Sequence, residues 1–136
     1  MRRFPPALIL VSLLFTMCSD RDLRSVRPDR TRDADGIIKL YGNKRQGDWM
    51  LKGKVVQVNA AIVVEKLGKG STVTVTGRET LTPILIHVQF APTERRAASL
   101  QPGDLVTFKG ICSGMNGSIR FESCISLGVS KPVERS

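Results

Sequence analysis

Residues 71–76 read Ser-Thr-Val-Thr-Val-Thr, a strict alternation of hydroxyl-bearing and apolar side chains. An alternation with a period of two is typical of a β-strand that buries one face. It returns in residues 84–90, Ile-Leu-Ile-His-Val-Gln-Phe, after a polar stretch that ends at Pro83. The two segments therefore predict neighbouring strands with one buried face. The residues expected on that face are Val73, Val75, Ile84, Ile86, Val88 and Phe90.

Three further β-segments flank this pair. Residues 51–67 are rich in valine and predict one long strand, with residues 47–50 leading into it. Residues 105–112 and 118–127 predict two more strands, joined by a hairpin at residues 114–117, Gly-Met-Asn-Gly. Five strands are thus expected in all.

Two helices complete the pattern. Residues 37–41 have apolar spacing that fits a short helix. Residues 93–100 predict a helix capped by Thr93, between the third and fourth strands. This order predicts an all-β fold, a five-stranded OB-type Greek-key barrel with a short N-terminal helix and one helix between strands 3 and 4. A small β-sandwich is the competing architecture.

The N-terminal segment has the pattern of an export signal. Two arginines follow Met1, and residues 7–17 then form an apolar run of 11 residues. A basic start before a run of this length is typical of a secretory signal, and the run is shorter than the roughly 20 residues that a transmembrane helix needs. A buried N-terminal helix is the alternative, which Pro5 and Pro6 disfavour.

Cys18 follows the apolar run, at the place where bacterial lipoproteins carry the cysteine that is acylated after cleavage. Met17 stands where a small residue is usual, and Phe15 where leucine is favoured. An uncleaved anchor and a nearby cut without lipidation therefore stay open as alternatives. An acylated Cys18 would hold the N-terminus at a membrane.

Residues 18–35 contain five arginines and five aspartates with almost no apolar side chains. Such a stretch cannot offset its ordering entropy by burial, so we predict a mobile tether. The matched aspartates disfavour an arginine-rich arm for nucleic acid. The chain then divides into a signal segment (1–17), a mobile charged tether (18–35), an OB-fold domain (36–128) and a polar tail (129–136).

Two regions of the predicted domain carry a family resemblance. The first is the ending, residues 100–114 and 119–125, with its Pro-Gly-Asp turn, Val-rich strand and two cysteines. The second is the opening, with Tyr41, Asn43 and Asp48 before residues 51–54, Leu-Lys-Gly-Lys. Together they resemble the tRNA-anti-like OB-fold family of exported bacterial lipoproteins, over residues 37–127. The resemblance implies an OB-fold and an envelope location, and it implies no activity.

An exported context permits a disulfide, and Cys112 and Cys124 fall on neighbouring predicted strands. Strict alternation would turn Cys124 outward, away from the side of Cys112. A β-bulge near Gly110 or Ser123 would remove this conflict. We therefore predict a disulfide between Cys112 and Cys124.

Catalysis finds little support in the sequence. The single histidine, His87, lies in mid-strand between two apolar residues, and no nucleophile elbow or phosphate-binding loop is present. Two cysteines and one histidine form no recognised metal-ligand spacing. We expect no catalytic residue, no metal and no cofactor.

OB-folds usually bind through the face of strands two and three. On the outer face of these predicted strands we expect Thr72, Thr74, Thr76, Leu85, His87 and Gln89. A plain solvated surface is the alternative for this face. From Ile37 onward the chain holds 14 Lys and Arg against 7 Asp and Glu, spread over several elements.

The aromatic residues bear on the choice of partner. Single-strand binders stack bases on exposed aromatic side chains, whereas Phe90, Phe108 and Phe121 all take core positions here. Basic charge without stacking residues suits an anionic surface better than base recognition. We expect a membrane-anchored binding module of the periplasm or cell envelope, with a protein or polysaccharide partner. Single-stranded nucleic acid is the alternative partner.

Overall fold

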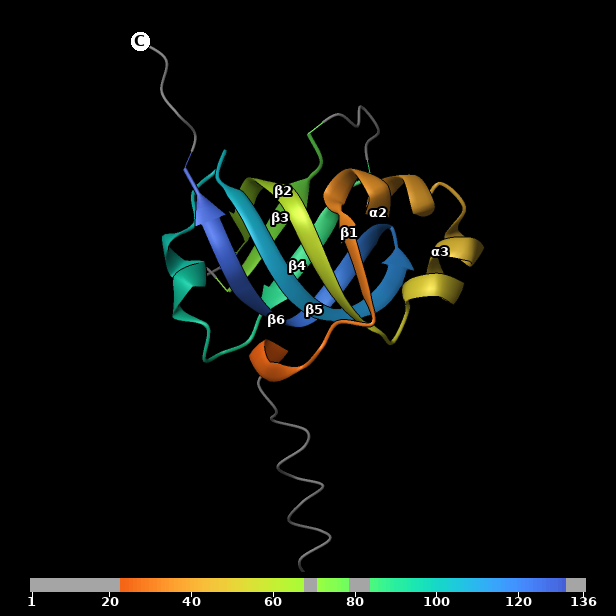
Figure 1. Ribbon diagram of the computed structural model, residues 1–136. Helices are drawn as coiled ribbons and strands as arrows, with labels where there is room; N and C mark the ends of the chain where they lie inside the picture. Colours follow the sequence, from red (N-terminus) through yellow and green to blue (C-terminus); the bar gives the residue numbers. More distant parts are fainter. Residues whose placement is uncertain (1–22, 68–70, 79–83, 132–136) are drawn as a thin grey trace, which may run out of the picture.

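Five strands close into a barrel in the computed structural model, which describes residues 23–67, 71–78 and 84–131 (Figure 1). The signal segment 1–17 and Cys18 lie outside the described residues. The barrel strands are β2 (Val55–Leu67), β3 (Thr72–Thr76), β4 (Ile86–Phe90), β5 (Leu105–Asn116) and β6 (Ser118–Ser130). They follow the order β2-β3-β4-β6-β5, and a further pairing of β5 with β2 closes the ring. The predicted all-β, OB-like barrel is confirmed at this level.

The long strand β2 turns a corner in its middle. Its first half pairs with β5 from Val55 to Ile62, and its second half pairs with β3 from Ile62 to Leu67. The register shifts between Val58 and Ala61, where Ala60 has a φ of 55°. A bulge of this kind bends a strand and increases its twist, so β2 can pair with β5 in its first half and with β3 in its second.

The barrel interior is filled as the alternation predicted. Val73, Val75, Ile86, Val88 and Phe90 are buried, and Ile84 packs at the edge of the core. From the other side, the rings of Phe108 and Phe121 meet edge to face with centroids 5.5 Å apart. Such aromatic pairs add to the stabilisation that burial itself provides.

The predicted tether is wrong for residues 23–35, whereas residues 18–22 lie outside the described residues. Residues Leu23–Ser25 form a 3-10 turn (η1), and Arg30–Asp33 form a strand (β1) that pairs in parallel with β2. Asp29 exchanges hydrogen bonds with the backbone of Val55 at the start of this pairing. The strand covers the edge of β2 that β3 leaves free, so backbone hydrogen bonds supply the order that apolar burial could not.

Two buried charges hold the η1 segment to the barrel. Lys109 Nζ donates to the backbone oxygens of Val26 at 2.6 Å and Arg24 at 3.1 Å. Glu94 accepts from Arg24 Nη2 and from the Ser126 backbone N–H, both at 2.7 Å. Because buried charges need such partners, this charged segment is part of the domain.

The two α-helices lie together at one side of the barrel (Figure 1). Helix α2 (Ala34–Leu40) begins three residues before the predicted segment, and Asp33 caps it through the Gly36 N–H. Residues Lys44–Leu51 form a helix (α3) instead of leading into a strand. The Asn43 side chain caps α3 by accepting from the Gln46 N–H, which satisfies a free donor of the first turn.

The segment between β4 and β5 is a 3-10 helix, η2 (Arg95–Ser99), and not the longer helix predicted for residues 93–100. Its cap is Glu94, whose side chain accepts from the Arg96 N–H, rather than Thr93. Thr93 was the wrong choice because Glu94 is buried and already serves as a shared acceptor.

The predicted polar tail begins too early. Strand β6 runs on to Ser130, which pairs with Leu105, and Val129 pairs with Val106. Beyond the strand, Lys131 Nζ lies 2.7 Å from Asp104 Oδ2. Pairing with β5 therefore orders residues 129–131, and residues 132–136 lie outside the described residues.

A substitution at Gly47 tests how closely α3 packs against Tyr41, at the end of α2. A Cβ at Gly47 would lie 2.5 Å from the Tyr41 ring, whereas one at Gly128 would meet open space. We expect Gly47→Ala to lower the free energy of unfolding by about 1–3 kcal/mol, in spite of alanine's higher helix propensity. Gly128→Ala is the matched control and should change it by less than about 1 kcal/mol. Urea denaturation followed by circular dichroism measures both, and equal values would contradict this packing.

Candidate functional site

A shallow groove of about 230 Å³ lies on the outer face of the barrel, over strands β3, β4 and β6. Two cross-strand rows build it. Thr72 pairs with Gln89 in one row, and Thr74 pairs with His87 in the other. Strand β6 runs parallel to β4, so His87 stands opposite Arg120. The lining residues are Thr72, His87, Gln89, Arg120, Phe121 and Glu122.

The groove continues past the end of β4. A second hollow of about 290 Å³ shares Gln89 and Glu122 with the first and extends over Phe90, Ala91 and Pro92 to Ser123. Ser123 has a φ of 56°, at the point where the register of β4 with β6 shifts between Val88 and Phe90. The bulge spreads the two strands' side chains at this point. The two hollows form one trough, which we call the β4–β6 groove.

The structure brings together part of the predicted binding face. Thr72, His87 and Gln89 line the β4–β6 groove. Thr76 and Leu85 are partly exposed but contribute to neither hollow.

Thr74 does not belong to an accessible surface. Its side chain is 1% exposed, and its Oγ1 has no hydrogen-bond partner among the described residues. Thr74 stands in the middle of the sheet, between Glu65 of β2 and His87 of β4. The alternation with the buried Val73 and Val75 did not predict that Thr74 itself would be buried.

Arg120 and Glu122 were missed as site residues. Both are exposed and flank the buried Phe121 on β6. Their outward positions follow from the alternation around Ile119 and Phe121, which was visible in the sequence. Their place beside His87 and Gln89 was not visible, because the parallel pairing of β4 with β6 joins segments about 30 residues apart.

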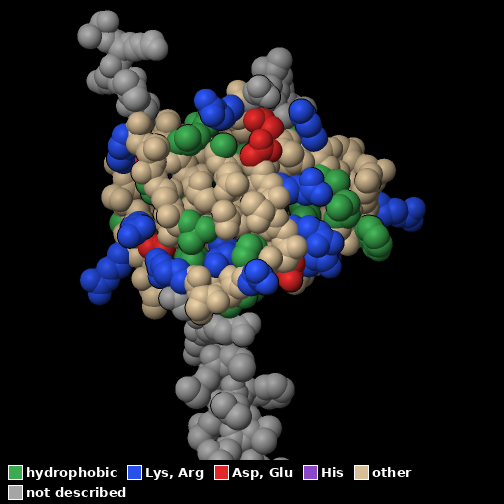
Figure 2. Space-filling view, viewed as in Figure 1, with side chains coloured by type: hydrophobic (Ala, Val, Ile, Leu, Met, Phe, Trp, Pro, Cys, Tyr) green, Lys and Arg blue, Asp and Glu red, His purple; other side chains and the backbone are tan. Residues whose placement is uncertain are grey.

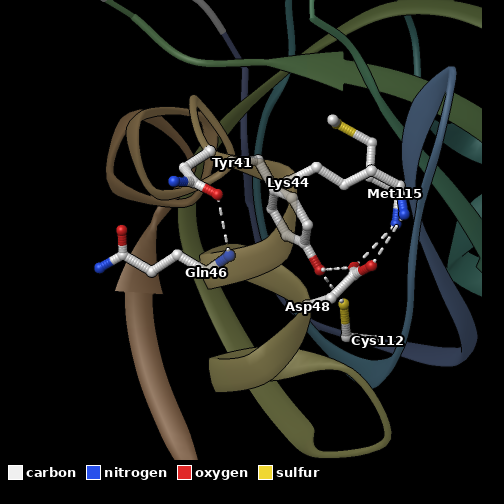
Figure 3. A network of polar contacts seen from close by, with 7 residues as sticks. Tyr41, Lys44, Gln46, Asp48, Cys112 and Met115 are labelled. Atoms are coloured by element: carbon white, nitrogen blue, oxygen red, sulfur yellow. Dashed lines mark hydrogen bonds and ion pairs between the residues drawn. The ribbon is translucent and has the colours of Figure 1, made fainter.

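The motif residues Tyr41 and Asp48 form a structural junction, whereas Asn43 caps α3 beside it (Figure 3). The Tyr41 hydroxyl donates to Asp48 Oδ1 at 2.9 Å, and the Met115 backbone N–H donates to the same oxygen at 3.2 Å. Lys44 Nζ lies 3.1 Å from Asp48 Oδ2. One carboxylate of α3 thus joins α2 and the end of β5.

This junction also explains the perturbed titration of its members. Burial raises the pKa of Tyr41 far above its usual value, and the neighbouring Cys112 and Asp48 add to this effect. Partial burial would raise the pKa of Asp48, but hydrogen bonds from Tyr41, Lys44 and Met115 outweigh it and lower that pKa overall. Asp48 is therefore held as a carboxylate, which suits an acceptor of three hydrogen bonds.

The predicted disulfide is wrong, because Cys112 and Cys124 are both buried free thiols. The register of β5 with β6 shifts between Lys109 and Ile111, and Ser123 of β6 lies in the same irregularity with a φ of 56°. This one bulge places Cys112 opposite Phe121, while the Cys124 sulfur fills the space over Gly110. The cysteines are therefore diagonal neighbours rather than a directly opposed pair. Burial raises the pKa of both thiols, most strongly that of Cys124.

Metal ligands and membrane-spanning helices are two further features that could indicate a function. Among residues 23–67, 71–78 and 84–131, no three or more His, Cys, Asp or Glu side chains gather as metal ligands. Within the same ranges, no helix is both long and apolar enough to cross a membrane. The polar groups of the groove, His87 included, offer hydrogen bonds and one pair of opposite charges.

No family model, curated protein or solved structure matches this chain. The residues and their geometry alone therefore carry the functional argument.

Asp48 makes the stability of the α3 junction depend on pH. Its folded pKa lies below the unfolded value of about 3.9, so the stability it provides is complete above that pH. That contribution is lost as the pH falls through the folded pKa. We expect Asp48→Asn to be less stable than the parent by about 1–2 kcal/mol at pH 7, with the gap closing in acid.

Urea midpoints measured from pH 7 to pH 2 check this expectation. Glu65→Gln removes one exposed carboxylate and is the matched control. A gap for Asp48→Asn that stays constant down to pH 2 would show that the Asp48 charge does not stabilise the junction.

Proposed function

We propose that this chain is an exported, membrane-tethered binding module of the bacterial cell envelope, whose β4–β6 groove binds an extended segment of a protein partner. The observation that carries this proposal is the lining of the groove. Its accessible side chains are a hydroxyl, an imidazole, an amide, a guanidinium and a carboxylate, from Thr72, His87, Gln89, Arg120 and Glu122. Side chains that include both donors and acceptors suit the peptide groups of an extended chain.

The barrel topology supports the site. The strands follow the order β2-β3-β4-β6-β5, β5 pairs with β2 to close the ring, and β4 and β6 pair in parallel. We expect this arrangement in a Greek-key OB barrel. In that assignment the groove lies over the second, third and fifth barrel strands, and OB-folds use the face of the second and third for binding. The 3-10 helix η2 takes the place of the helix between strands 3 and 4.

The choice between partners depends on aromatic side chains. Stacking on exposed aromatics is the usual way to hold sugars or bases against a surface. The only aromatic side chains beside the groove are Phe90 and Phe121, which are 2% and 1% exposed. We therefore place a polypeptide first and a polysaccharide second.

Single-stranded nucleic acid is kept as the alternative function because Trp49 of α3 is 80% exposed beside Arg45. This side chain could stack on a base, but it belongs to a different surface from the groove. Catalysis is not part of the proposal, since the groove holds one histidine and no metal-binding cluster is present among the described residues.

Site-specific photo-crosslinking in intact cells tests the groove. A photoreactive residue in place of Gln89 should give a protease-sensitive adduct, while one in place of Gln101 should not. Gln101 is the matched control, an exposed glutamine on the turn before β5. Adding Arg120→Ala should lower the Gln89 adduct about tenfold, because a charge-assisted hydrogen bond is lost.

Equal yields from the two positions would contradict a site in the groove. An adduct that glycosidases remove would replace the polypeptide by a polysaccharide. An adduct that nucleases remove would support the alternative function.

Cys18 gives the test of export and tethering. Expressed in a bacterial host, the chain should appear in the membrane fraction as a species that starts at Cys18 and carries acyl mass. Cys18→Ala should abolish the acylated species, whereas Cys112→Ala should leave it unchanged. Fractionation with intact-mass measurement decides, and a full-length cytoplasmic species would contradict export.

A further inference from the structure

Trp49 is the most exposed large hydrophobic side chain in the described part of the chain. It is 80% exposed on α3, while Gly47 and Leu51 of the same helix face inward and are buried. A tryptophan offers more apolar area than almost any other side chain, so leaving it in water forgoes a large gain from burial. Single exposed apolar residues are common on protein surfaces, so the surroundings of Trp49 decide whether this surface binds a partner.

Two adjoining hollows lie on this side of the molecule, and Trp49 lines one of them. One, of about 280 Å³, is lined by Asn43, Arg45, Gln46 and Trp49. The other, of about 410 Å³, shares Asn43 and Gln46 with it and is also lined by Arg32, Gly36, Lys39 and Leu40. We call the combined surface the α2–α3 face. It shares no lining residue with the β4–β6 groove.

The charge of this face is mostly positive. Arg32, Lys39 and Arg45 line the two hollows, whereas the Asp33 carboxylate at the edge of the larger one accepts a hydrogen bond from the Gly36 N–H. Asp48 belongs to the same helix as Trp49 but binds Tyr41, Lys44 and Met115 instead. Figure 2 shows Lys and Arg side chains beside hydrophobic ones at the right of the molecule, where α2 and α3 lie in Figure 1.

We propose that the α2–α3 face docks on an anionic lipid bilayer, with Trp49 at the headgroup level and Arg32, Lys39 and Arg45 against lipid phosphates. Tryptophan favours this interface because its ring is apolar and its N–H is polar. Long basic side chains place their stems along apolar material and their charges among headgroups. The face has no second aromatic side chain that could hold a base or a sugar ring from the other side. The pairing of one protruding tryptophan with three cations therefore favours a bilayer over a nucleic-acid strand.

The docking would set the orientation of the barrel at the membrane. A single acyl chain holds a protein only weakly, and a basic patch is a usual second signal. The proposal does not depend on what the groove binds. The groove proposal and the docking proposal can fail separately, because the first is measured by crosslinking at Gln89 and the second by the fluorescence of Trp49.

The test uses the fluorescence of Trp49, the only tryptophan in the chain. The full chain is added to vesicles of phosphatidylcholine alone or with 30% phosphatidylglycerol. The predicted apolar run 7–17 would hold the chain to both kinds of vesicle, so the readout is the environment of Trp49 rather than binding. We expect a blue-shifted emission and protection from acrylamide quenching with phosphatidylglycerol only, both reversed by high salt.

The variants separate this face from general attraction. Lys39→Ala with Arg45→Ala should raise the anionic lipid needed for half of the shift about 25-fold, since each cation near such a surface contributes about fivefold. Arg95→Ala with Arg96→Ala is the control, because these exposed arginines on η2 also remove two charges. This control should leave the shift nearly unchanged.

Three results would overturn the proposal. The first is no shift of Trp49 emission with anionic vesicles. The second is an equal loss in the two double variants, which would indicate attraction without a docking face. The third is quenching of Trp49 by oligothymidylate without a shift on vesicles, which would assign the face to single-stranded nucleic acid.

Discussion

Closure of the barrel depends on β2, which is paired with three other strands. Its first half lies between β1 and β5, and its second half pairs with β3. The change of partner takes place at the bulge around Ala60, whose φ of 55° costs local strain that the surrounding pairing offsets. Without that bend, β2 could not pair with both β5 and β3, and the sheet would stay open.

The charged N-terminal segment belongs to the same arrangement. β1 pairs with a stretch of β2 that would otherwise present an open edge. Lys109 and Glu94 bind the η1 segment that precedes β1. A segment with almost no apolar side chains is thus ordered by backbone pairing and charge-assisted hydrogen bonds. If the chain is tethered through Cys18, the η1 turn that is held to the barrel begins only five residues later, at Leu23. Such a short connection would hold the barrel close to the membrane, where the α2–α3 face could reach lipid.

The two candidate surfaces differ in the ligands they favour. The β4–β6 groove is polar, carries both charges and includes only deeply buried aromatics. The α2–α3 face is mostly positive and has one protruding tryptophan. We infer that the β4–β6 groove selects a partner by hydrogen bonding, whereas the α2–α3 face orients the barrel at the membrane. This division would explain a basic chain whose binding groove is not itself strongly basic.

The five barrel strands, the inward faces of β3 and β4 and the barrel class could be predicted from the sequence, because alternation records which side of a strand is buried. Strand β1 could not, because it has no such alternation. The alternation also placed Thr72, His87 and Gln89 on the outer face. Tertiary structure alone decided which residues stand beside them, since Arg120 and Glu122 arrive through a parallel pairing that leaves no local pattern. It likewise decided that Thr74 is covered, that the cysteines are diagonal neighbours and that residues 23–35 fold. These outcomes depend on bulges, cross-strand register and long-range hydrogen bonds, which connect residues that the sequence keeps apart.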